Sequence, residues 1–106
     1  MRDIQWLKDA EDELISIVNY VSLIQGINVA MQVYDDIISR VELLADFPEL
    51  GTLENKYKFK NNTLRILHTK HTRIFYSIQE TRIVVVLLWN NVMDDKNIGN
   101  IISTRE

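Results

Sequence analysis

Basic side chains and both histidines of this chain gather in one stretch, residues 55–91. Seven bases and a single acid, Glu80, lie there, and His68 and His71 fall among them. Arginine can grip a phosphate or a carboxylate through two parallel hydrogen bonds, and imidazole changes its charge near neutral pH. The stretch is therefore suited to binding anions, in the form of nucleic acid or of an acidic protein partner.

The lysines and arginines of this stretch differ in how strongly they indicate a site. Lys56, Lys58 and Lys60 are spaced by two residues and would point the same way in an extended segment, but a solvated loop explains them more simply. Arg65 and Arg73 lie in segments with strand periodicity, where an arginine held in register can bind an anion. A cross-strand ion pair explains the two arginines equally well, so both interpretations stay open.

The histidines and Tyr76 have structural explanations that outweigh a chemical role. His68 shares a strand face with Leu64 and Ile66, which favours a buried, hydrogen-bonded imidazole, and His71 falls near a turn. Two histidines three residues apart, without carboxylates beside them, do not make a metal site, and the chain has no cysteine, so we expect no metal and no other cofactor. Tyr76 is typical of an aromatic residue at the edge of a core, whose hydroxyl group bonds to water or backbone.

The rest of the chain carries the opposite charge. Residues 1–54 contain eleven acids and three bases, a balance of −8, whereas seven bases and one acid give residues 55–91 a balance of +6. We expect the folded molecule to have one anionic and one cationic region.

The N-terminal part of the chain predicts a short strand followed by a helical hairpin. Apolar and polar residues alternate over residues 4–6. From Asp9, which can cap a helix, apolar residues recur at helical spacing as far as Gly26, which can end it. A second helix is expected over about residues 28–46, with more than one apolar face, and Pro48 forces it to stop.

The C-terminal part has the periodicity of strands. After a polar, lysine-bearing connection, Thr63–Thr69 and Thr72–Gln79 alternate as antiparallel strands do, and Ile83–Trp89 reads as a central strand buried on both faces. The tail beyond Asn90 predicts a short docked helix. The expected fold is α+β, with an N-terminal short strand and helical hairpin packed on a C-terminal antiparallel β-sheet.

Length and composition limit the classes of protein that need be considered. The 106 residues, 46% of them apolar, predict a single domain over residues 1–106. No apolar run approaches the roughly 20 residues needed to span a bilayer. The first residues are charged where a secretory signal would be apolar, so we expect a cytoplasmic protein without membrane contact.

The order of these elements and several residues resemble the RelE/ParE superfamily, the toxins of type II toxin-antitoxin modules, also known as plasmid stabilisation system proteins. The likeness covers nearly the whole chain. It rests on Trp6 closing the first strand, Ala10, Leu14 and Ile17 opening the hairpin, Ala30 in the second helix, the turn Phe47-Pro48-Glu49-Leu50-Gly51, the strand Arg73-Ile74-Phe75-Tyr76, and Trp89-Asn90-Asn91 followed by Asp94-Asp95-Lys96.

The resemblance implies a bacterial protein that inhibits growth unless a cognate antitoxin is bound. ParE-like members poison DNA gyrase, and RelE-like members cleave mRNA on the ribosome. Cleavage needs cations that stabilise the phosphorane and groups that move protons, and here the candidates are Arg65, Arg73, His68 and His71. However, Val92 and Met93 stand where the superfamily commonly has arginine, and no histidine or tyrosine follows Tyr76.

These departures favour a ParE-like toxin that binds its target over an enzyme. An mRNA endonuclease and a degenerate member that only binds antitoxin are the alternatives. Antitoxins of this kind carry an acidic, disordered tail, for which the basic region and apolar grooves along the hairpin would be receptors, in a homodimer or a hetero-oligomer. The expected target-binding or antitoxin-binding residues are Lys56, Lys58, Lys60, Arg65, Lys70, Arg73 and Tyr76.

Overall fold

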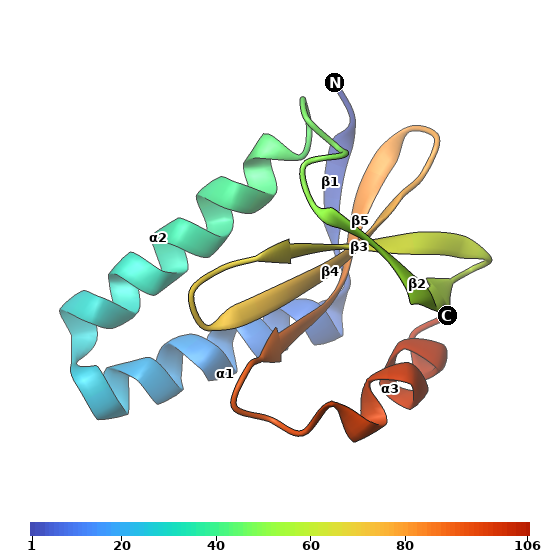
Figure 1. The fold of residues 1–106 in the computed structure, drawn as a ribbon. Coiled ribbons are helices and arrows are strands. Elements are labelled where there is room, and N and C mark those ends of the chain that lie inside the picture. The colour runs from blue at the N-terminus through green and yellow to red at the C-terminus, as the bar shows by residue number, and fades with distance from the viewer.

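The computed structural model describes residues 1–106, and the chain runs from a short strand through a helical hairpin into a sheet and a final short helix (Figure 1). The predicted α+β architecture is confirmed. The elements in order are β1 (Asp3–Trp6), α1 (Lys8–Gln25), α2 (Ile27–Leu43), β2 (Thr52–Phe59), β3 (Asn62–His68), β4 (Thr72–Ile78), β5 (Arg82–Asn90), the 3-10 turn η1 (Asp95–Asn97) and α3 (Ile98–Thr104).

All five strands form one sheet in the order β1-β5-β4-β3-β2. β5 pairs antiparallel with β4 but parallel with β1, so the sheet is mixed and not wholly antiparallel as expected. Alternation over residues 4–6 identifies a strand but says nothing about the direction of its neighbour. The prediction for Ile83–Trp89 is confirmed, because every residue of that run is at most 4% exposed.

Strand β2 is the element that the sequence pattern missed. The segment expected to be a polar connection pairs with β3 as an edge strand, with an irregularity between Glu54 and Lys58. Its apolar side chains explain the difference, since Phe59 is buried and the Tyr57 ring meets that of Phe75 edge-on at 6.2 Å. Exposed lysines on an edge strand also discourage pairing with other chains.

The helix limits differ slightly from the prediction. α1 begins at Lys8, directly after the β1 ladder, which the Leu7 N–H extends by donating to the Val85 carbonyl at 3.1 Å. Leu7 occupies the N-cap position, and its apolar side chain makes no capping hydrogen bond. Asp9 therefore lies inside the first turn and is not the cap. α1 ends at Gly26, whose φ of 92° suits glycine, as expected. α2 ends at Leu43, three residues before Asp46, and the chain continues as a turn.

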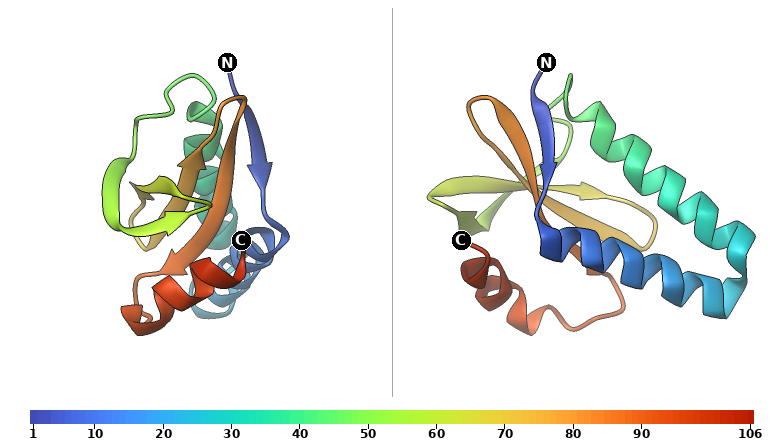
Figure 2. Two further views of the ribbon diagram at one scale, coloured as in Figure 1. Left: turned by 90° about the vertical axis from the view of Figure 1, so that its right-hand side faces the viewer. Right: turned by 180° about the vertical axis from the view of Figure 1, so that it is seen from behind.

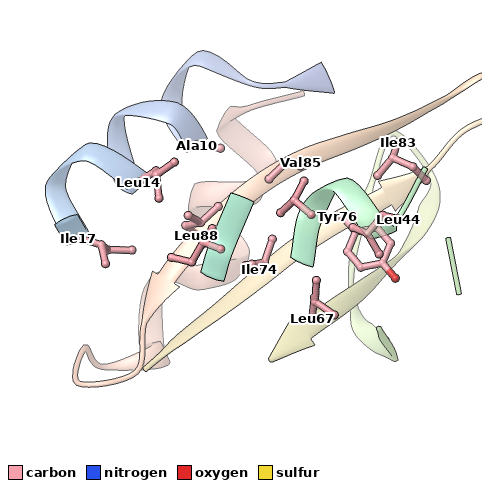
Figure 3. Close-up of a cluster of buried hydrophobic side chains, with 12 residues drawn as sticks. Ala10, Leu14, Ile17, Leu44, Leu67, Ile74, Tyr76, Ile83, Val85 and Leu88 are labelled. Carbon is pink, nitrogen blue, oxygen red and sulfur yellow. The ribbon is translucent and has the colours of Figure 1, made fainter. Parts of the chain in front are cut away.

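The sheet separates two hydrophobic cores (Figure 2). On one face, which we call the hairpin face, α1 and α2 cover the sheet, and Figure 3 shows Ala10, Leu14 and Ile17 directed toward β5, which carries Val85 and Leu88. On the other, the α3 face, the expected tail helix docks. Its core contains Phe59, Leu64, Ile66, Phe75, Val84, Val86, Leu87, Trp89, Ile98 and Ile102. None of the helices is both long and apolar enough to cross a membrane.

Candidate functional site

Strand register places Arg65 and Arg73 on opposite faces of the sheet. Arg65 is directly opposite Tyr76, a residue of the hairpin-face core. Arg73 is opposite His68, two pairs along from Ile66 and Phe75 of the α3-face core, and side chains two pairs apart project to the same face. Because opposed residues in a ladder project to the same side, the two arginines cannot bind one anion together.

Arg65 is engaged with backbone on the hairpin face. Its Nη1 donates to the carbonyl oxygens of Gly51 at 2.8 Å and Glu49 at 3.3 Å. The hydroxyl group of Tyr76 donates to the Pro48 carbonyl at 2.7 Å and accepts from the Gly51 N–H at 2.9 Å. Arg65 and Tyr76 thus fix the turn that leads out of α2.

Tyr76 is fully buried, so it is not available to a partner at the surface. Burial raises the pKa of its phenol, and the Gly51 N–H opposes this shift. The expectation that its hydroxyl group bonds to backbone is confirmed, whereas its inclusion among binding residues does not fit this placement.

Arg73 holds an acid on the α3 face. Its Nη1 and Nη2 donate to the two carboxylate oxygens of Asp95 at 3.1 and 2.5 Å, and its Nε donates to Asn91 Oδ1 at 3.0 Å. The hydrogen bond from Arg73 is the main reason that the pKa of Asp95 is lowered, and the nearby positive charge of Lys56 lowers it further. Arg73 and Lys56 thus both act on Asp95, and the chain's own carboxylate occupies the Arg73 fork.

His68 lies at the open end of β3 and is exposed, contrary to the expected burial. The alternation with Leu64 and Ile66 is real, but His68 is the last residue of the strand. Its Nε2 is 3.4 Å from Thr52 Oγ1. Strand alternation predicts which face a side chain takes, but not whether a helix covers that end of the strand.

The other predicted residues are dispersed. Lys58 reaches toward Thr63 Oγ1 at 3.4 Å, and Lys60, in the β2–β3 turn, lies over the ring of Phe59. Lys70 and His71, in the β3–β4 turn, line a hollow beside α2. The expected single cationic surface is therefore not formed. No group of three or more His, Asp or Glu side chains is arranged to hold a metal ion.

A hydrophobic hollow lies between the two helices of the hairpin. It has a volume of about 280 Å³, and its lining is formed by Trp6, Glu11, Leu14, Ile15, Tyr34 and Ile38. Further apolar side chains are exposed on the same two helices: Leu23, Ile24, Ile27 and Met31. The resemblance to the toxin family implied apolar grooves along the hairpin, as receptors for an antitoxin.

Sequence reasoning missed the ion pair between Arg105 and Glu13. Arg105 donates to both carboxylate oxygens of Glu13 at 2.8 and 2.7 Å and to the Val86 carbonyl at 2.8 Å. The hydrogen bond to Glu13 raises the pKa of Arg105. No periodic pattern could have linked a tail residue to the first helix.

A short strand, a helical hairpin that covers one face of a sheet, and a terminal helix on the other face define the RelE/ParE class of toxin fold. A family model described as the ParE toxin of the type II toxin-antitoxin system parDE matches residues 4–94, and the chain belongs to that family. A solved structure described as "Chromosomal ParDE TA system from P. aeruginosa" has a TM-score of 0.70 and 16% identity, over 85% of this chain and 96% of that one. Among curated proteins there is no significant match.

Proposed function

We propose that this chain is a toxin that inhibits growth by binding DNA gyrase in the cytoplasm, and that a cognate antitoxin neutralises it. Membership of the ParE family is the observation that carries the proposal. The site geometry agrees, because the residues that a nuclease would need are dispersed: Arg65 lies on one face of the sheet, and Arg73 on the other is engaged by Asp95.

The hairpin hollow is the surface that we assign to the antitoxin. Ile15 is 57% exposed and Tyr34 is 39% exposed, yet both line a concave apolar surface. An amphipathic helix lays apolar residues at i, i+3, i+4 and i+7 into a groove of this kind. Burial of such side chains gives roughly 1.5–3 kcal/mol each, so a few of them suffice for stable binding.

The target is tested with purified DNA gyrase and with cells. Addition of the protein should inhibit supercoiling of plasmid DNA, and induced expression should cause gyrase-dependent DNA breaks while transcripts stay intact. Growth arrest with unaffected gyrase and uncut mRNA would assign the toxin to a different target. A chain that does not arrest growth even without antitoxin would be a degenerate member.

The antitoxin surface is tested by charge substitutions in the hollow. Ile15→Glu and Tyr34→Glu should each abolish rescue by the product of the small acidic reading frame expected beside this gene. Tyr20→Glu is the matched control, since Tyr20 is similarly exposed at 51% but lies five residues from Ile15, on another side of a helix with about 3.6 residues per turn. Equal rescue of all three variants would exclude this surface.

One observation favours the alternative of an mRNA endonuclease. His68 faces Arg73 across the β3–β4 ladder. The charge of Lys56 is near enough to lower the pKa of Asp95, the carboxylate that Arg73 binds. An imidazole beside a guanidinium could move a proton next to a bound phosphate. Codon-phased mRNA cuts on primer extension that vanish in both Arg73→Ala and His68→Ala would establish this activity and overturn the gyrase proposal.

A further inference from the structure

The Arg73 site contains a donor that nothing in the chain satisfies. Trp89 is opposite Arg73 in the β4–β5 ladder and is only 4% exposed. Its indole Nε1 is buried without a hydrogen-bond partner. The indole lies close enough to Asp95 to contribute to the lowering of that residue's pKa, but the distance and angle of its N–H do not make a hydrogen bond. A buried donor without an acceptor is unfavourable, so the site is incomplete with Asp95 as its anion.

Asp95 is less firmly placed than the groups that bind it. The Arg73 side chain is 20% exposed and emerges from the sheet, whereas the Asp95 side chain is 56% exposed and opens the short turn η1. An incoming carboxylate can form the same two hydrogen bonds with Arg73, and the released Asp95, already more than half exposed, is hydrated instead. The carboxylate of Asp95 can therefore be exchanged for another at small cost.

We propose that Arg73, Trp89 and Lys56 form a binding site for a carboxylate side chain of an acidic protein segment, and that Asp95 is an internal competitor which that side chain displaces. The incoming carboxylate takes the two guanidinium hydrogen bonds and, free of the constraint of η1, also accepts from the indole N–H. Residues 91–97 are then released at the sheet, while the bond from Arg105 to Glu13 keeps the far end of α3 in place.

A carboxylate fits this site better than a run of phosphates does. The present occupant is itself a carboxylate bound through both oxygens, the geometry that the arginine fork recognises. Nucleic acid would need further cations along its backbone, but Arg65 is on the opposite face and Lys60 is in a distant turn.

The test compares two neighbouring carboxylates by NMR and calorimetry, with a short poly-glutamate peptide as the probe. Asp95→Asn should bind the peptide about fivefold or more tightly than the native protein, because the internal competitor is neutralised. Asp94→Asn is the matched control: it makes the same change of charge one residue away, but Asp94 bonds to the Lys96 N–H and not to Arg73. Its affinity for the peptide should equal that of the native protein.

The indole signal reports whether the peptide occupies the proposed site. The chain has two tryptophans, and Trp6→Phe assigns their two indole N–H resonances. Binding should shift the Trp89 resonance, and Arg73→Gln added to Asp95→Asn should abolish both shift and affinity gain. Equal affinities of the two Asn variants, or an unmoved Trp89 resonance, would refute the site. If an RNA oligonucleotide shifted Trp89 more strongly than the peptide, the site would bind phosphate. No antitoxin or gyrase is used, so the outcome is independent of the proposed function.

Discussion

The guanidinium of Arg105 and the carboxylate of Glu13, 92 residues apart in the sequence, together complete the open edge of β5. β1 pairs with β5 only as far as Val85, and on the other side of β5 the register with β4 skips Val86. Beyond this point Glu13 accepts the Leu88 N–H at 3.1 Å, and Arg105 donates to the Val86 carbonyl at 2.8 Å. The ion pair therefore satisfies the backbone where a neighbouring strand is missing, and it ties the end of α3 to α1.

Removal of one partner of this pair should be costly. The Arg105 side chain is 10% exposed and that of Glu13 is 25% exposed, so Glu13→Ala leaves the largely buried guanidinium with only the Val86 carbonyl and the more distant Asp9, at 3.6 Å, and leaves the Leu88 N–H unpaired. We expect a loss of roughly 2–3 kcal/mol in the free energy of unfolding, measured by denaturant titration. Asp36→Ala, which breaks the exposed Arg40 pair, is the control and should cost about 0.5 kcal/mol or less. Similar losses in the two variants would contradict this role for Glu13.

Gly51 is required by close packing beneath the turn. A Cβ at this position would lie 2.8 Å from the Ile66 carbonyl and from two atoms of the Tyr76 ring and hydroxyl group. Gly51→Ala should therefore lower stability by about 1–3 kcal/mol. Gly99, which lies within α3, offers the contrast. The atom nearest to a Cβ there would be 3.4 Å away, and alanine is more favourable than glycine in a helix by up to about 1 kcal/mol. Thermal unfolding should show a lower melting temperature for Gly51→Ala and a higher one for Gly99→Ala than for the native protein.

Gly26 is required for a different reason, its backbone conformation. Its φ of 92° and ψ of 164° are accessible essentially to glycine alone, although a Cβ would meet nothing within 4 Å. Gly26→Ala should cost about 1–3 kcal/mol through strain at the hairpin tip. Denaturant unfolding measures this loss. A variant as stable as the native protein would show that the hairpin can turn with a negative φ.

Tyr76 should titrate at a higher pH than the ordinary value for a tyrosine. Burial raises the pKa of Tyr76 above its ordinary value, so the folded state prefers the neutral phenol. This contribution to stability is fully present below the pKa of an unfolded tyrosine, near 10, and is lost as the pH rises through the higher folded pKa. Ultraviolet absorbance of tyrosinate should show a delayed phase that is absent in Tyr76→Phe. If that variant kept the delayed phase, another tyrosine would be responsible.

Much of the fold could be predicted because periodicity reflects burial directly. The helical spacing from Ala10 to Val21 and the unbroken apolar run of β5 both correspond to buried residues. β2 could not be predicted in this way. Only Phe59 is buried in it, and most of its other residues, such as Glu54, Asn55, Lys56 and Lys58, are those of a polar loop.

The candidate site was harder to predict because binding depends on which residues meet. Arg65 and Arg73 are both strand arginines, and the sequence places each in a strand but not on a face relative to the other. The face depends on register, and a shift of one residue would reverse it. Only the paired strands show that Arg65 meets Tyr76 while Arg73 meets His68.

The amino-acid sequence by itself determined the order of the elements other than β2, the buried central strand, the split of charge and the resemblance to this toxin family, because those properties lie in local pattern. The tertiary structure alone decided the partners of the charged groups. Asp95 binds Arg73 and Arg105 binds Glu13 from a tail with no periodic constraint. Such pairs depend on how distant segments pack, since an ion pair needs contact in space and not spacing along the chain.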